Sequence, residues 1–517
     1  MRMAKVLLVG IDGGTWNILK PLIADGRIKH FEEIVAEGVH GKLRSTIPYT
    51  TLPGWTSMFT GVNPGKHGLI DNMIYEGGRY VLANSSYRMV PMWNLMSRKE
   101  LKIILVNDPA SYPPEPIGIH ITGLLTPFTS KNYVYPPTLR KEIDRIANGY
   151  IPDVQREYYE ALGKDFESAF NMVEDYAEKI YRVSRYLLKN YEWDIGCVIF
   201  TSTDRLQHFF WHRKQYISRH YQNIDEYLKE FLNLISEEEA NIIIASDHGF
   251  NGVHEFFYIN SWLYRKGLLV PKKEAKVTKG FRSLGITRSA VIRMLRRSRS
   301  LYKIAKSLTP KSVKRLLPLT ERLQVDHEKS SIYAITNLGL FINRSLIEGG
   351  YEELRTKLMD EVRKLKSSEG EPIVKAVYRR EEILFGPYIY RAPDIIIIPR
   401  TGYKVRSELY MDFRLHSPPY NPDYGISPTG EHAINGILMA YGSDIARGKN
   451  VDAVIWDIAP TIMHMHGFPI PKYFDGKVVK EIFSGKSKLS SAPIKIEDHA
   501  KYKIIRRIGA LKRSGKL

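Results

Sequence analysis

The stretch NIIIASDHGF, residues 241–250, combines an apolar run with two polar side chains at its end. Such an uninterrupted run is typical of a strand that is buried on both faces of a parallel sheet. Ligand sites in these sheets open beyond the carboxyl ends of the strands, where Asp247 and His248 would stand. A carboxylate beside an imidazole suits zinc or manganese. The alternative interpretation is a strand end whose Asp and His only cap a turn.

Two other apolar runs also lead into an acid. Residues 6–11 precede Asp12, and residues 194–200 precede Asp204 by a few positions. Between the apolar runs, the sequence is mostly of helical periodicity. Strands that alternate with helices predict an α/β fold around a mostly parallel sheet.

The formal net charge of +20 is concentrated in two segments. Residues 271–317 contain 15 lysines and arginines and one acid, and residues 486–517 contain 10 basic and two acidic residues. The remaining chain is close to neutral. We therefore predict one catalytic α/β domain from residues 1–270 and 325–485, a basic helical insertion at 271–324, and a basic C-terminal tail at 486–517.

Composition also bears on location and partners. The single cysteine, Cys197, excludes a disulfide framework. We predict a cytoplasmic protein, because the chain shows neither a signal pattern nor an apolar run of the roughly 20 residues that span a bilayer. The basic amphipathic insertion predicts peripheral contact with an anionic membrane surface, with a lid helix packed on the core as the alternative. Nucleic acid is not expected as a partner, because interleaved aromatics are lacking.

Candidate metal ligands gather near the predicted strand ends. Asp204 and His208 are four positions apart and would share one face of a helix. His432, in PTGEHAING, precedes another apolar strand. Any one of these acids alone is better explained as a helix cap than as a metal ligand. The full set of six predicts a metal centre and consists of Asp12, Asp204, His208, Asp247, His248 and His432.

A hydroxyl nucleophile would complete the chemistry of such a centre. Thr51 lies in the stretch TTLPGW, just before an expected helix start. The free N–H groups of a helix N-terminus favour phosphate. A threonine hydroxyl attacks only when a base or a metal lowers its pKa, and two metals can do this while holding the leaving oxygen. The alternative is that Thr50, Thr51 and Thr56 merely cap a turn and a helix.

These motifs together resemble the alkaline phosphatase superfamily, in particular its type I phosphodiesterase/nucleotide pyrophosphatase branch. The resemblance covers residues 6–483 apart from the basic insertion. It implies a three-layer α/β/α fold with a central, mostly parallel sheet. The motifs that carry it are GIDGG around Asp12, TTLPGWTSMFTGVNPGKHG around Thr51, TDRLQH around Asp204, SDHGF at Asp247 and GEHAINGILMAYG at His432.

The resemblance also implies roles for individual residues. Two divalent metal ions per chain are expected, with Zn²⁺ as the leading candidate and Mn²⁺ as the alternative. Thr51 would attack phosphorus and become a transient phosphothreonine. The first metal would be held by Asp12, Thr51, Asp247 and His248, and the second by Asp204, His208 and His432.

Three further residues are expected to contact the substrate, Asn72 by the resemblance and Trp55 as an aromatic wall of the pocket. Asn72, in HGLIDN, corresponds to the asparagine that helps to hold a phosphoryl oxygen. Gly54 and Trp55 lie next to the nucleophile. Gly54 departs from the family pattern, because nucleotide pyrophosphatases commonly have asparagine there. This departure weakens the nucleotide part of the expectation more than the phosphoryl-transfer part.

The sequence therefore predicts a metal-dependent phosphohydrolase that cleaves phosphodiester or pyrophosphate bonds. Its substrate would be a phosphorylated small molecule or a lipid- or glycan-linked phosphate. A phosphomonoesterase or phosphomutase on the same fold is one alternative. It would need a cationic clamp, for which Arg205, Lys66 and Arg414 are candidates. A surface-docked binding protein with an inactive phosphatase fold is the other alternative.

Overall fold

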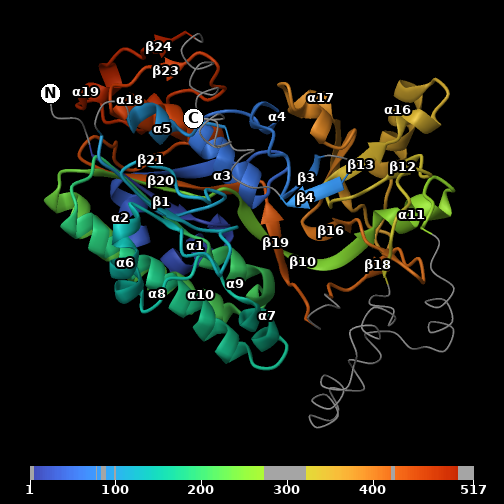
Figure 1. Cartoon of the computed structure of the whole chain (residues 1–517), viewed down its shortest axis with the longest axis horizontal. Helices are drawn as coiled ribbons and strands as arrows, with labels where there is room; N and C mark the ends of the chain where they lie inside the picture. The colour runs from blue at the N-terminus through green and yellow to red at the C-terminus, as the bar shows by residue number, and fades with distance from the viewer. Residues whose placement is uncertain are drawn as a thin grey trace. The chain divides into compact units, whose positions relative to one another are not determined.

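The computed structural model describes residues 5–76, 79–82, 89–97, 101–272, 322–420 and 426–498 (Figure 1). The chain forms two compact units, a division that the sequence analysis did not predict. The first unit comprises Met1–Gly252, Ile383–Ala392 and Ile426–Leu517, and the second comprises Val253–Glu382 and Pro393–Gly425. Most of the predicted basic insertion and the end of the predicted tail lie outside the described residues, so both stay predictions.

A large sheet organises the first unit. Among the described residues it has ten strands, with five parallel strands at its centre in the order β9, β1, β8, β5 and β6. These central strands are β9 (Asn241–Ala245), β1 (Val6–Ile11), β8 (Ile195–Phe200), β5 (Ile103–Asp108) and β6 (Ile119–Thr122). On one side, β20 (Asn435–Gly442) pairs antiparallel with β9, and β2 (Val39–Arg44) pairs antiparallel with β20; on the other side, β7 (Val134–Tyr135) pairs antiparallel with β6.

The central strands show why their sequences are apolar throughout. Every residue of β1, β8 and β9 is buried. Both faces of the sheet are covered by helices, so both the odd and the even positions of each strand need apolar side chains. The register pairs Val6 of β1 with Ile195 of β8 and with Asn241 of β9, which brings the carboxyl ends of the three strands side by side.

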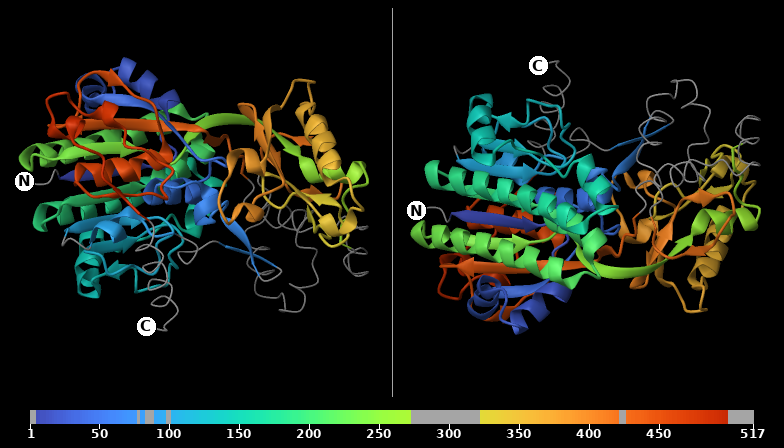
Figure 2. Two further views of the ribbon diagram at one scale, coloured as in Figure 1. Left: turned by 90° about the horizontal axis from the view of Figure 1, so that it is seen from above. Right: turned by 90° about the horizontal axis from the view of Figure 1, so that it is seen from below.

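Helices cover the sheet on two sides. One face packs against α8 (Phe166–Asn190) and α10 (Lys214–Glu237), which run side by side (Figure 2, right). Phe200 of β8, for example, contacts Tyr227 and Phe231 of α10. The other face packs against α3 (Thr51–Thr60), α5 (Met92–Met96) and α18 (Ile458–Met465) in one apolar core. The predicted three-layer α/β/α fold with a mostly parallel sheet is thereby confirmed.

The helix α3 begins earlier than the sequence analysis expected. Thr50 is its N-cap residue and Thr51 its first residue, so Pro53 lies within the first turn. Proline is tolerated there because the first N–H groups of a helix have no intrahelical acceptor. The helix ends at Gly61, which adopts the left-handed conformation with φ of 66°. All ten helical residues are buried, which makes α3 a central rather than a surface helix.

The second unit has its own sheet and its own apolar core. Its four-stranded sheet runs in the order β12 (Ile332–Tyr333), β13 (Gly339–Ile342), β15 (Ile395–Pro399) and β14 (Val374–Arg379). Residues of this sheet, of α11 (Ile259–Arg265) and of α16 (Tyr351–Arg363) share one hydrophobic cluster. The predicted metal ligands all belong to the first unit.

Within the described part of the chain, no helix has the length and apolar character needed to cross a bilayer.

Candidate active site

The candidate site lies beyond the carboxyl ends of three neighbouring strands. Asp12 follows β1, and Asp247 and His248 follow β9. Helix α9 (Ser202–Phe210) begins just after β8 and carries Asp204 and His208 one turn apart. His432 belongs to β19 (Gly430–Ala433), whose pairing with the start of β10 (Gly249–Tyr258) places it opposite Phe250. The structure thus brings all six predicted ligands together in two groups.

The first group consists of Asp12, Asp247 and His248, which are fully buried. His248 Nε2 lies 3.2 Å from Asp247 Oδ2 and 3.7 Å from Asp12 Oδ1. Among the described residues, neither of these two carboxylate oxygens has a hydrogen-bond partner. Two buried anionic oxygens without donors are costly unless a cation binds them.

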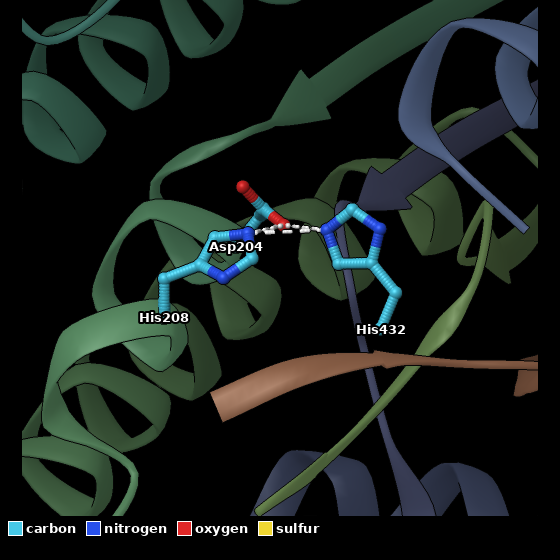
Figure 3. A group of neighbouring side chains, drawn as sticks. All are labelled: Asp204, His208 and His432. Carbon is cyan, nitrogen blue, oxygen red and sulfur yellow. Dashed lines mark hydrogen bonds and ion pairs between the residues drawn. The ribbon is translucent and has the colours of Figure 1, made fainter. Parts of the chain in front are cut away.

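The second group consists of Asp204, His208 and His432 (Figure 3). His432 Nε2 lies 3.1 Å from both Asp204 Oδ1 and His208 Nε2, and His208 Nε2 lies 3.3 Å from Asp204 Oδ1. Figure 3 shows the two rings approaching from opposite sides with the carboxylate between them. The groups adjoin each other, because the rings of His248 and His432 stack with centroids 3.7 Å apart.

Hydrogen bonds of the histidine Nδ1 atoms orient the three rings so that their Nε2 atoms face the site. In each ring, Nδ1 donates its proton to a backbone carbonyl: His208 to Gly430, His248 to Gly249 and His432 to Tyr49, at 3.1 to 3.3 Å. The Nε2 atom of each neutral ring therefore carries a lone pair. Metal-binding histidines are commonly oriented in this way by a backbone carbonyl or a carboxylate.

The carboxylates show a matching arrangement. Each has one oxygen in the site and the other held from outside. Trp55 Nε1 donates to Asp12 Oδ2 at 3.1 Å, the Gly13 N–H donates to Asp247 Oδ1 at 3.1 Å, and Arg205 Nη1 donates to Asp204 Oδ2 at 3.0 Å. The remaining oxygens and the histidine Nε2 atoms form two clusters of acceptors. Such clusters fit divalent cations, and their mixed N and O donors suit Zn²⁺ or Mn²⁺.

Burial and the close approach of these side chains shift the pKa values of the three carboxyl groups and of His248. Burial raises the pKa of Asp12 well above its ordinary value, and the charges of Asp247 and Asp204 add to the rise. Burial likewise raises the pKa of Asp247. Burial also acts to raise the pKa of Asp204, but His208 and His432 outweigh it and hold that pKa well below the ordinary value. Burial, together with neighbouring His432, lowers the pKa of His248, which keeps the ring neutral.

Thr51 lies against the first group. Its Oγ1 is 3.4 Å from His248 Nε2, and the side chain is buried at the first residue of α3. Gly54 explains how α3 comes so close to the strand end. A Cβ at this position would lie 2.9 Å from Asp247 Cβ and 3.0 Å from the Asp247 carbonyl oxygen. A side chain at residue 54 would therefore displace either the helix or the segment that carries Asp247 and His248.

The predicted substrate contacts are placed differently. Trp55 is 1% exposed and belongs to the core, where its indole N–H holds Asp12. Gly54 faces the Asp247 backbone. Asn72 is exposed, and its backbone N–H donates to the Asp71 carboxylate. Substrate binding by these three residues stays a prediction. The sequence analysis did not identify Trp55 and Arg205 as partners of site carboxylates.

Comparison with known proteins gives a family match over most of the chain. A family model described as type I phosphodiesterase / nucleotide pyrophosphatase matches residues 6–426. A curated relative, ectonucleotide pyrophosphatase/phosphodiesterase family member 3 of Rattus norvegicus, is 26% identical over 160 residues. This match spans 30% of the chain and only 15% of the length of that relative.

Solved structures share the fold at low sequence identity. Human ectonucleotide pyrophosphatase/phosphodiesterase 5 is similar with a TM-score of 0.50 and 15% identity, over 93% of this chain and 100% of that chain. Phosphonoacetate hydrolase from Sinorhizobium meliloti 1021, in complex with phosphonoformate, is similar with a TM-score of 0.54 and 16% identity, over 89% and 94% of the two chains.

Proposed function

The chain belongs to the type I phosphodiesterase/nucleotide pyrophosphatase family, and on this premise we propose that it hydrolyses phosphodiester or pyrophosphate bonds with Thr51 as the nucleophile. The observation that carries the proposal is the placement of one hydroxyl beside two acceptor clusters. Thr51 Oγ1 lies 3.4 Å from His248 Nε2, and the His248 ring stacks on His432 of the second group. In the first cluster, neither Asp12 Oδ1 nor Asp247 Oδ2 has a hydrogen-bond partner among the described residues, which supports the binding of a cation there.

The chain would hold two divalent metal ions, for which Zn²⁺ is the first candidate and Mn²⁺ the second. Asp12, Asp247, His248 and Thr51 would bind one, and Asp204, His208 and His432 the other. When bound, such a pair lowers the pKa of a coordinated hydroxyl and neutralises charge on the attacking and leaving oxygens. The buried setting strengthens these interactions, because little water competes in it.

The reaction of Thr51 proceeds in two displacements. Its oxygen forms a bond to phosphorus as the bond to the leaving alkoxide or phosphate breaks, and the hydroxyl proton of Thr51 passes by way of solvent to the leaving oxygen. The product is a phosphothreonine that still carries the second ester group of a diester substrate. Water then attacks phosphorus, and Thr51 leaves and regains a proton. The free N–H groups at the start of α3 are suited to hold phosphoryl oxygens through both steps.

The salt bridges of the candidate clamp residues, Arg205, Lys66 and Arg414, support a diester or pyrophosphate substrate over a monoester. A monoester dianion usually needs an arginine or lysine clamp. Arg205 is paired with Asp153 and Asp204. Lys66 is paired with Asp475 and donates to the Tyr473 carbonyl. Arg205 and Lys66, the two candidates in the unit that contains the site, therefore each already have a carboxylate partner. Arg414, in the second unit, pairs with Asp412. We therefore place the phosphomonoesterase and phosphomutase alternatives second.

Turnover of two synthetic esters tests the proposal. The full-length chain, reconstituted with Zn²⁺ or with Mn²⁺, is given bis(p-nitrophenyl) phosphate and p-nitrophenyl phosphate in parallel. We expect a higher kcat/KM for the diester, and its loss on chelation. A higher kcat/KM for the monoester would favour the phosphomonoesterase. Two bound metals without turnover of either ester would favour the inactive binding protein.

A further inference from the structure

We propose that Arg205 and Asp153 form a positioning pair, which orients the Asp204 carboxylate for metal binding. The inference rests on the proposed function and deepens it. It concerns residues that the sequence motifs do not link, because Asp153 lies 52 positions before Arg205 in an irregular segment. It also gives Arg205 a role other than that of a phosphate clamp.

Arg205 connects the two carboxylates directly. Its Nε and Nη2 donate to Asp153 Oδ1 and Oδ2 at 3.0 and 2.8 Å, a two-pronged pair. Its Nη1 donates to Asp204 Oδ2 at 3.0 Å. The other oxygen of Asp204, Oδ1, is the one that faces His208 and His432. The planar guanidinium therefore sets the rotation of the Asp204 carboxylate about its last bond.

The segment that bears Asp153 is anchored to the same corner of the fold. The Tyr176 hydroxyl donates to the Pro152 carbonyl at 3.1 Å and lies 2.6 Å from Thr201 Oγ1, just before α9. The Tyr158 hydroxyl donates to the Arg205 carbonyl at 2.7 Å. Tyr176 and Thr201 are buried. Asp153 and Asp204 thus share buried anchors, which keeps the geometry of the pair constant.

The charges explain why a second carboxylate is needed. Asp12 and Asp247 are held by neutral donors, the Trp55 indole and the Gly13 N–H, but Asp204 is held by a cation. An unneutralised Arg205 would compete with a metal for both oxygens of Asp204. Asp153 accepts the fork of Arg205 and offsets its charge, so that one N–H remains for Asp204. The exposed fractions of the Arg205 and Asp153 side chains are 17% and 14%, so solvent screens the pair only partly.

Metal titration tests the pair without relying on turnover. Metal-free full-length protein is titrated with Zn²⁺ in a calorimeter, and we expect two binding events in the wild type. Asp153→Asn keeps the shape of the side chain and removes its charge. We expect it to weaken one of the two events by about 10- to 100-fold and to leave the other unchanged. Arg205→Lys keeps the positive charge but loses the fork, and should weaken the same event.

A matched control and a rescue separate positioning from general structure. Glu160→Gln breaks the exposed pair of Arg156 and Glu160 in α7 (Arg156–Leu162), close to Asp153 in sequence, and should leave both events unchanged. Excess Zn²⁺ should restore the kcat for bis(p-nitrophenyl) phosphate in Asp153→Asn. The melting temperature of each metal-free variant shows whether the fold has been weakened.

The possible outcomes are distinct. Wild-type binding of both ions in Asp153→Asn and Arg205→Lys overturns the inference. Equal weakening of both events with a lower melting temperature also overturns it, because the pair would then serve the fold as a whole. If Asp153→Asn does not fold, Arg205→Lys alone decides. A wild-type chain that binds fewer than two zinc ions would instead overturn the metal assignment within the proposed function.

Discussion

Asp12 and Asp204 both follow strands of the central sheet, yet their surroundings act on them in opposite directions. Burial and the neighbouring acids raise the pKa of Asp12, whereas His208 and His432 outweigh burial and lower the pKa of Asp204. Asp12 Oδ1 has no hydrogen-bond partner among the described residues. Asp204 has histidines on one oxygen and Arg205 on the other.

This contrast shows that the two groups are prepared differently for a metal. In the second group, Asp204 is already paired with a cation, Arg205, before any metal binds. The first group, Asp12, Asp247 and His248, carries carboxylate charge that only a cation would offset. Thr51 lies against this first group, where a hydroxyl proton is removed more easily once a cation is bound.

The largest effect is expected from Thr51, the hydroxyl that distinguishes the first group. Thr51→Ala should lower kcat/KM for a diester by at least about 10³-fold, because no nucleophile remains. Thr51→Ser should keep part of the activity, since its hydroxyl survives. Steady-state rates at saturating Zn²⁺ provide the measurement. Equal rates for Thr51→Ala and the wild type would place the nucleophile elsewhere.

An intermediate effect is expected from the loss of one ligand of the second group. His432→Ala should lower the metal content from two ions per chain towards one, because the group retains only Asp204 and His208. Elemental analysis of dialysed protein measures this ratio. His254, in the second unit, is not a predicted ligand, and His254→Ala serves as the control that should keep two ions. Unchanged metal content in His432→Ala would make His432 a structural residue.

The smallest effect concerns the stability of the metal-free protein and has opposite signs in the two groups. Asp12→Asn should raise the free energy of unfolding by about 1 kcal/mol at pH 7, because it removes a buried charge and can keep the bond from Trp55. Asp204→Asn should lower it by about 1 to 3 kcal/mol, because the charge-assisted bond from Arg205 is lost. Urea unfolding of chelated proteins measures both changes.

The pH dependence of this difference follows from the direction of the Asp12 pKa shift. The unfolded chain ionises Asp12 near its ordinary value of 3.8, and the folded protein does so only at higher pH. The wild type therefore loses stability relative to Asp12→Asn as pH rises from about 4 through the raised pKa. The gap should be larger at pH 7 than at pH 5. A gap that is constant with pH would mean that burial of the Asp12 charge is not its source.

Much of the sheet, and the meeting of the six candidate ligands at one edge of it, could be predicted because both are encoded locally. Apolar runs such as residues 241–245 are buried on both faces, and the acid after each run is brought to the same sheet edge by parallel pairing. The start of α3 was predicted three or four residues late, after Pro53 rather than at Thr51. Proline there marks the first turn of a helix as well as the residue before one, and the sequence pattern does not separate the two.

The partners of the ligands could not be predicted, because they depend on how distant segments meet. Nothing near Trp55 in the sequence indicates that its indole N–H reaches Asp12, 43 positions away. Asp153 belongs to no motif, and Arg205 was considered only as a phosphate clamp. Gly54 was treated as a departure from the family pattern. In the structure its lack of a Cβ allows α3 to approach Asp247.

Trapping of the covalent intermediate tests the central claim most directly. Zn²⁺-loaded protein is mixed with bis(p-nitrophenyl) phosphate, quenched in acid within milliseconds, digested, and analysed by mass spectrometry. We expect that the peptide containing Thr51 gains one p-nitrophenyl phosphoryl group, that fragmentation places the group on Thr51, and that Thr51→Ala lacks it. Steady turnover with the group on another residue, or with none on any peptide in the quenched sample, would contradict the claim that Thr51 is the nucleophile.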